Sequence, residues 1–106
     1  MEKDFKKLEE ELNIVRSKID LVDERLKYLL KERFQLIEKI VEIKKELKAD
    51  YFDSKREYNI YKMLEQDLPQ DKIKPLQNIF ERILDESRAF QRKILNQKSS
   101  ADAKNK

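Results

Sequence analysis

The sequence predicts an all-α protein of three helices, the first of them very long, that assembles as a homodimer. Three observations predict this class. The 106 residues include no glycine, and the two prolines, Pro69 and Pro75, lie close together, so little opposes helix elsewhere. Apolar residues in the first half recur at alternating spacings of three and four over about six heptads. Charged residues make up 44% of the chain, which favours helices with a solvated face.

The first predicted helix covers residues 5–47. Its apolar stripe, called the seam below, consists of Phe5, Leu8, Leu12, Val15, Ile19, Val22, Leu26, Leu29, Leu36, Ile40, Ile43 and Leu47. Arg33 occupies the seam position between Leu29 and Leu36. Such a helix would be about 65 Å long, too long to fold compactly on itself. We therefore expect a second copy of the chain, related by a two-fold axis, to cover the seam.

The second helix is predicted to begin at Ser54, which has the spacing of a capping box with Glu57, and to end at Leu68 before Pro69. The third is predicted to begin between Asp71 and Pro75, where a first-turn proline is tolerated.

The third helix combines apolar and polar residues on one face. Its predicted buried residues are Leu76, Ile79, Phe80, Ile83, Leu84, Phe90, Ile94 and Leu95. Ser87 and Gln91, one helical turn apart, share this face. We interpret residues 1–95 as one domain and the polar residues 96–106 as a disordered tail.

Missing residue types restrict the chemistry. Without His, Cys or Gly, the sequence excludes a thiol nucleophile, a Ser-His relay, the usual soft metal sites and a phosphate-binding glycine loop. Catalysis would rest on Lys, Arg, carboxylates, amides and hydroxyls, or on positioning. The net charge of +3, with both signs mixed, gives little support to nucleic-acid binding. No apolar stretch suits a membrane span, and the absence of Cys together with a charged N-terminus predicts a cytoplasmic protein.

Two cations in the first helix indicate an anion site. Arg33 and Lys44 are eleven residues apart, which places them on one face about 16 Å apart along the axis, a gap suited to a small dianion. Arg16 is rotated by roughly 100° from Arg33, so we expect it to reach the partner subunit's site.

Each of these residues also has a simpler interpretation. Isolated cations on a charged helix are usually solvated, and Glu57 could be only the second half of the capping box. Ser87 could donate to the carbonyl one turn earlier, and Gln91 could mark the edge of the buried face. Spacing alone leaves these alternatives open.

Three runs of the sequence carry motifs at fixed spacing. The first helix contains VRSKIDLVDERLKYLLKERFQLIEKIVEIKK, with an early Arg, Ile-Asp, Asp-x-x-Leu, Leu-Leu-x-x-Arg and a Lys eleven residues further. The second contains DSKREYNIYKML, with Asp-x-x-Arg-Glu, and the third contains ILDESRAFQ, with Glu-Ser-x-x-x-Gln. Over residues 12–95 the chain thereby resembles the all-helical chorismate mutases. The resemblance implies an intertwined homodimer with two sites that converts chorismate into prephenate.

The resemblance also implies roles for individual residues. Arg16 of one subunit and Arg33 of the other would bind the two carboxylates of chorismate, with Ser87 assisting one of them. Lys44 would bridge a carboxylate and the ether oxygen, to which Gln91 would donate a second hydrogen bond. Lys44 and Gln91 are therefore the expected catalytic residues.

The remaining implied contacts lie at the start of the second helix. Glu57, with the backbone near Asp53, would hold the ring hydroxyl, and Arg56 would orient these carboxylates. The implied reaction is a concerted shift that needs no nucleophile, metal or cofactor, which suits this composition. Its rate would come from selecting a near-attack conformer and stabilising charge on the ether oxygen.

Two other functions fit part of the pattern. Isochorismate-pyruvate lyases resemble the mutases in fold and cations, but Ser87 and the complete Asp-x-x-Arg-Glu motif favour the mutase. A non-catalytic helical dimer or adaptor would leave Arg33, Ser87 and Gln91 on apolar faces unexplained. Docking on another shikimate-pathway enzyme stays open.

Overall fold

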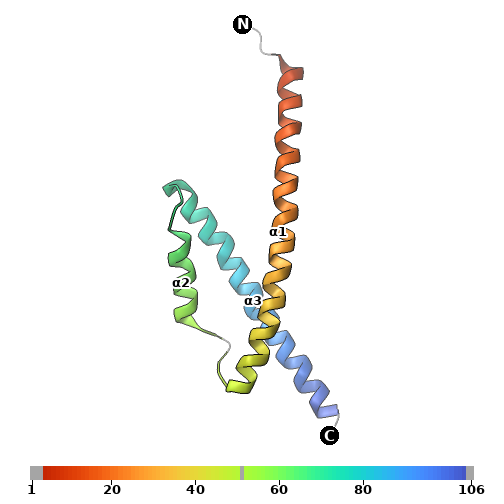
Figure 1. The fold of residues 1–106 in the computed structure, drawn as a ribbon, viewed down its shortest axis with the longest axis vertical. Helices are drawn as coiled ribbons and strands as arrows, with labels where there is room; N and C mark the ends of the chain where they lie inside the picture. Colours follow the sequence, from red (N-terminus) through yellow and green to blue (C-terminus); the bar gives the residue numbers. More distant parts are fainter. Residues whose placement is uncertain (1–3, 51, 105–106) are drawn as a thin grey trace. The chain divides into compact units, whose positions relative to one another are not determined.

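The chain forms three α-helices joined by two short connections (Figure 1). The computed structural model describes residues 4–50 and 52–104. α1 runs over Phe5–Leu47, α2 over Ser54–Leu64 and α3 over Gln70–Lys104, and these described ranges contain no strand. The predicted all-α fold with a very long first helix is confirmed. None of the helices in the described ranges has an apolar stretch long enough for a membrane span.

Both ends of α1 are defined by local hydrogen bonds. At its start, the Asp4 carboxylate accepts a hydrogen bond from a first-turn backbone N–H at 3.1 Å. At its end, Lys48 adopts a left-handed conformation with φ 54°, and its N–H donates to the Lys45 carbonyl at 3.3 Å. The Ala49 N–H donates to the Lys44 carbonyl at 3.0 Å, which completes a Schellman motif. The bounds of α1 are those that the seam predicts.

The chain divides into two units, Met1–Gln35 and Leu36–Lys106, which we describe separately. The first unit contains most of α1. Its seam side chains are all exposed, from 45% at Leu8 to 73% at Phe5. In this unit, the half-buried side chains among the described residues are those of Leu30, Arg33 and Phe34.

The second unit contains the apolar core. Its buried apolar residues come from all three helices and are Ile37, Val41, Leu64 and Leu84. α2 and α3 pack against each other. The part of α1 in this unit does not bury its seam, because Leu36, Ile40, Ile43 and Leu47 are 43–70% exposed. A neighbouring face, which carries Ile37 and Val41, is buried instead.

The cap and the end of α2 differ from the prediction. The helix begins at Ser54 as expected, but its N-cap is Asp53, whose side chain accepts from the Arg56 N–H at 3.0 Å. A capping box opened by Ser54 is therefore the wrong interpretation. α2 ends at Leu64 rather than Leu68, and Asp67 in the following turn has a left-handed φ of 59°. The last turn of α2 tightens, because the Glu65 and Gln66 N–H groups donate to the Lys62 and Met63 carbonyls, three residues back, at 3.2 Å each, so the helix ends before the proline is reached.

α3 begins at Gln70, earlier than the predicted range, so Pro75 lies inside the helix and not in its first turn. Proline has no N–H, so the Asp71 carbonyl accepts no helical bond from residue 75. At its other end the helix continues past Leu95 to Lys104, where the sequence suggested disorder from residue 96. No Gly or Pro occurs there to stop it. The division into a domain at 1–95 and a separate tail at 96–106 stays a prediction.

Candidate active site

The predicted site residues come from all three helices. Those in the second unit lie in the last turn of α1, at the start of α2 and in the middle of α3, and they are Lys44, Asp53, Arg56, Glu57, Ser87 and Gln91. Arg16 and Arg33 belong to the first unit.

Ser87 and Gln91 are the two buried polar residues in the described part of the chain, at 4% and 8% exposure. Four residues apart on α3, they lie on the face that also buries Leu84. The Gln91 Oε1 atom has no hydrogen-bond partner among the described residues. An unsatisfied buried amide oxygen costs about 1–3 kcal/mol, so the site carries an unfilled bonding position of the kind a ligand can fill.

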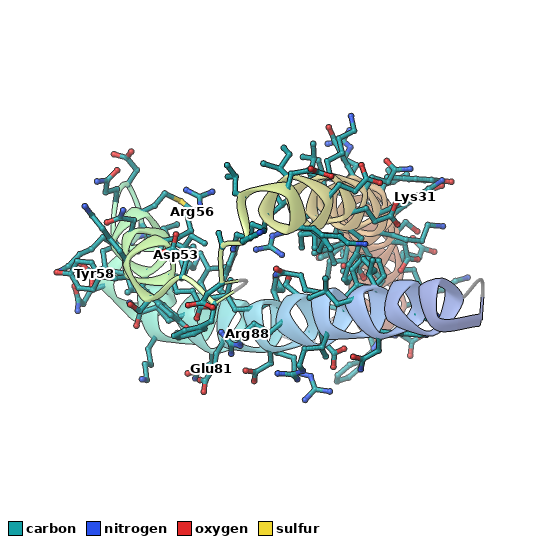
Figure 2. All side chains as sticks on the ribbon, turned by 90° about the horizontal axis from the view of Figure 1, so that it is seen from below. Lys31, Asp53, Arg56, Tyr58, Glu81 and Arg88 are labelled. Atoms are coloured by element: carbon teal, nitrogen blue, oxygen red, sulfur yellow. The ribbon has the colours of Figure 1, made fainter. Side chains whose placement is uncertain are left out.

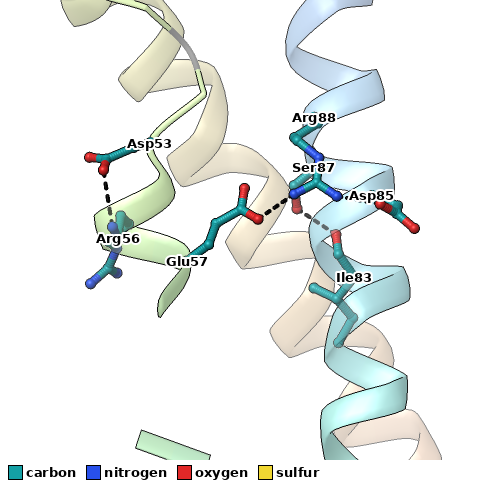
Figure 3. A network of polar contacts seen from close by, with 7 residues as sticks. All are labelled: Asp53, Arg56, Glu57, Ile83, Asp85, Ser87 and Arg88. Carbon is teal, nitrogen blue, oxygen red and sulfur yellow. Dashed lines mark hydrogen bonds and ion pairs between the residues drawn. The ribbon is translucent and has the colours of Figure 1, made fainter. Parts of the chain in front are cut away.

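The Ser87 hydroxyl donates to the Ile83 carbonyl at 2.7 Å, which is the local contact that sequence reasoning offered as the simpler alternative (Figure 3). Ser17 makes the same contact with Asn13 at 3.0 Å on an exposed helix surface. The local bond is therefore common to both serines and does not decide between the interpretations. Burial distinguishes Ser87. A hydroxyl has one hydrogen, so Ser87 must turn away from Ile83 to donate to a ligand.

Lys44 lies in the last turn of α1 and is half-buried. It follows Val41 by three residues and Ile40 by four, so it projects between the buried face of α1 and the exposed seam. The carbonyl end of a helix carries partial negative charge, which stabilises an ammonium group in this turn. The Schellman motif also fixes the backbone from which Lys44 projects.

The two arginines of the first unit differ in exposure. Arg33 is half-buried, whereas Arg16 is exposed together with the seam residues around it. Arg33 is predicted to approach Lys44, which belongs to the second unit, and Arg16 is predicted to reach the partner's site. Both stay predictions.

The start of α2 presents three predicted residues in different ways. Asp53 and Arg56 are exposed and contact each other through the Arg56 backbone N–H. The Arg56 side chain points away from α3, whereas Glu57 extends toward α3 and accepts a hydrogen bond from Arg88 (Figure 3). Glu57 is therefore bound to another helix and not to the backbone of Ser54, as a capping box would require.

Sequence reasoning missed Arg88. Its Nη1 donates to Glu57 Oε1, its Nη2 donates to Asp85 Oδ1, and its guanidinium lies over the Phe52 ring, 5.9 Å from the ring centre. The hydrogen bond with Glu57 raises the pKa of Arg88 above its ordinary value, and that with Asp85 raises it further, against the opposing effect of burial. The spacing of Asp85 and Arg88, three apart on one helix, is the local signal that could have identified it.

Tyr61 follows Glu57 by one turn of α2 and is half-buried. Burial raises the pKa of its hydroxyl, and the nearby Glu81 and Glu57 carboxylates raise it further. Tyr61 therefore stays neutral at physiological pH. Tyr58, by contrast, lies at the outer edge of α2 and is 59% exposed (Figure 2).

The model of the family described as chorismate mutase type II matches residues 15–92, well over half of the chain. The chain belongs to the chorismate mutase type II family. Membership confirms the prediction that the protein is an enzyme of the isomerase class. All eight predicted site residues lie within the matched range. No curated protein and no solved structure matches the chain.

Proposed function

We propose that the protein converts chorismate into prephenate, in the biosynthesis of phenylalanine and tyrosine, by holding a reactive conformer among fixed donors. The observation that carries this proposal is the buried Gln91 side chain, whose Oε1 has no bonding partner in the described chain, one turn from buried Ser87. An amide oxygen left unsatisfied in an otherwise apolar face supports a ligand-binding role over a structural one. Family membership supplies the class of ligand.

The rearrangement breaks an ether C–O bond while a C–C bond forms, so negative charge grows on the ether oxygen. In the proposal, two hydrogen-bond donors stabilise that charge. Lys44 offers an ammonium group from the fixed last turn of α1, and Gln91 offers an amide N–H from α3. Rotating the Gln91 amide by half a turn places Nε2 where Oε1 now lies, so the unfilled position can hold a donor. Fixed donors need no reorganisation as the charge develops.

Recognition of the two carboxylates is assigned to Arg33, to Arg16 of the partner and to the Ser87 hydroxyl. The exposed seam of the first unit supports an intertwined homodimer, because monomeric proteins rarely expose so long a row of apolar side chains. Exposure of Arg16 beside that seam supports its use by a second subunit.

Glu57 is proposed to hold the ring hydroxyl, assisted by the backbone near Asp53 and by Arg56. Its carboxylate is already fixed by the contact with Arg88. A carboxylate that is held in place and ionised is a strong hydrogen-bond acceptor for a hydroxyl group.

The test is incubation with chorismate and, separately, with isochorismate, followed by identification of the products. We expect prephenate from chorismate and no pyruvate from isochorismate. Pyruvate formation without prephenate would instead establish the lyase, and the absence of both reactions would favour the helical adaptor.

A matched pair of serine variants links this activity to the site. Ser87→Ala should lower kcat/KM about tenfold, since a hydrogen bond to a charged group is lost. Ser17→Ala removes the same helical contact on an exposed surface and should leave kcat/KM unchanged. A cytoplasmic location and docking on another shikimate-pathway enzyme stay predictions from the sequence.

A further inference from the structure

The ion pair between Arg88 and Glu57 joins α3 to the start of α2 beside buried Ser87 (Figure 3). Its side chains are 23% and 21% exposed. The pair formed by Arg82 and Glu86 on α3 is far more exposed, at 77% and 52%. Water and salt screen exposed pairs strongly and partly buried ones much less. The Arg88 pair is therefore the one suited to hold a side chain in a defined position.

Arg88 is itself held by contacts other than Glu57. Asp85 bonds Nη2 from the same helix, and the Phe52 ring lies beneath the guanidinium. The planar guanidinium presents its donors in a fixed fork, so two anchored positions determine the direction of the third contact. Arg88 thus directs Nη1 at one oxygen of Glu57.

The two oxygens of the Glu57 carboxylate are not equivalent. Arg88 bonds Oε1, and no residue of the described chain is bonded to Oε2. An ionised carboxylate accepts hydrogen bonds at both oxygens, so Oε2 keeps its capacity for a ligand. A hydroxyl group is the complementary donor.

We propose that Arg88 is a positioning residue that holds Glu57 through Oε1, so that Oε2 receives the ring hydroxyl of the substrate. This inference rests on the proposed function. Arg88 does not itself contact the substrate. Its effect is confined to ligands that carry the hydroxyl, which separates positioning from a general role in stability.

The experiment compares two ligands with the whole 106-residue chain. The first ligand is chorismate, for which kcat/KM is measured. The second is a chorismate analogue with hydrogen in place of the ring hydroxyl, for which the competitive inhibition constant is measured. Arg88→Gln should lower kcat/KM for chorismate about tenfold or more, because a hydrogen bond from a charged group no longer directs Glu57. The inhibition constant of the analogue should stay within about twofold of the wild-type value.

A double-mutant cycle gives the second readout. In a Glu57→Gln background, adding Arg88→Gln should lower kcat/KM no further, because the residue through which Arg88 acts is already altered. The control is Arg82→Gln, which removes an exposed pair on the same helix and should change neither ligand's constant. The inference would be overturned if Arg88→Gln weakened the enzyme's interaction with both ligands equally. It would also be overturned if Arg88→Gln lowered kcat/KM in the Glu57→Gln background by as much as it does in the wild type.

Asp85→Asn keeps the test decisive if Arg88→Gln does not fold. Asp85 is 51% exposed, and the substitution loosens Arg88 without changing Glu57. It should lower kcat/KM for chorismate about threefold, again without effect on the analogue. Unchanged kcat/KM in this variant would contradict the proposal. A wild-type protein that does not react with chorismate would overturn the proposed function and this inference together. An active wild type in which the effects of Arg88→Gln and Glu57→Gln on kcat/KM are additive would overturn the inference alone.

Discussion

The two units of the chain use their apolar residues in opposite ways. In Met1–Gln35 the seam is exposed along its whole described length, whereas in Leu36–Lys106 a small core is buried and encloses Ser87 and Gln91. One unit therefore has an apolar surface without a core, and the other has polar groups in a core. The proposed dimer requires the first arrangement and the proposed ligand site requires the second.

The largest expected effect comes from the seam. Replacing Ile19 and Leu26 together by Asp should raise the dissociation constant of the proposed dimer by at least about 10³, because each buried aliphatic side chain contributes about 2–5 kcal/mol. Sedimentation velocity measures it, and activity at low protein concentration should fall in parallel. Lys31 points outward from α1, so Lys31→Asp is the control and should leave the dimer intact (Figure 2). A seam variant that stays dimeric would show that the first unit is built for something else.

In the second unit, Lys44→Ala should reduce turnover by at least about 10², because a fixed donor aimed at developing charge contributes roughly 3–4 kcal/mol. Steady-state kinetics measure the loss. Lys45, the neighbouring cation in the same turn, is exposed and provides the matched control as Lys45→Ala. Equal effects of the two substitutions would remove Lys44 from the mechanism.

Gln91 allows a second test of the second unit, through the pH dependence of enzyme activity. A glutamate in its place donates a hydrogen bond only when protonated, so the Gln91→Glu enzyme should be active at acidic pH and lose activity as the pH rises. The wild-type amide does not titrate. Kinetics across pH compare the two enzymes, and a flat profile for the variant would count against the contact with the ether oxygen.

The smallest effect is expected at the end of α1. Lys48 has a side chain in a left-handed conformation that glycine adopts without strain, so Lys48→Gly should raise the free energy of unfolding by up to about 1 kcal/mol. Urea denaturation measures the change. Lys39→Gly, within exposed helix, should lower it by a similar amount, and a loss of stability in Lys48→Gly would contradict the assigned strain.

Local patterns predicted the helices well, because seam periodicity and breakers act within a few residues. The start of α2 was predicted at the correct residue, but its cap was assigned to Ser54, since Asp53 and Ser54 are both good caps and only backbone geometry chooses between them. The end of α2 was predicted from Pro69, although the helix tightens at Glu65 and Gln66 and ends before the proline.

The features that could not be predicted depend on packing between residues far apart in the sequence. Leu36 and Ile37 are adjacent apolar residues, as are Ile40 and Val41, so periodicity alone does not say which member of each pair the chain buries on itself. Arg88 was missed because its partner Glu57 lies on another helix, 31 residues away. The buried positions of Ser87 and Gln91, in contrast, follow from the apolar face of α3 and were visible in the sequence.

The central claim, that a site in one chain's second unit is completed by the partner's first unit, has a direct test by subunit mixing. Arg16→Ala and Lys44→Ala proteins, each expected to be nearly inactive alone, are unfolded together and refolded as mixed dimers. If Arg16 acts across the interface, each mixed dimer holds one intact site, and random pairing restores about a quarter of wild-type activity. If Arg16 acts within its own chain, every site carries one defect and the mixture stays inactive, which would contradict the account.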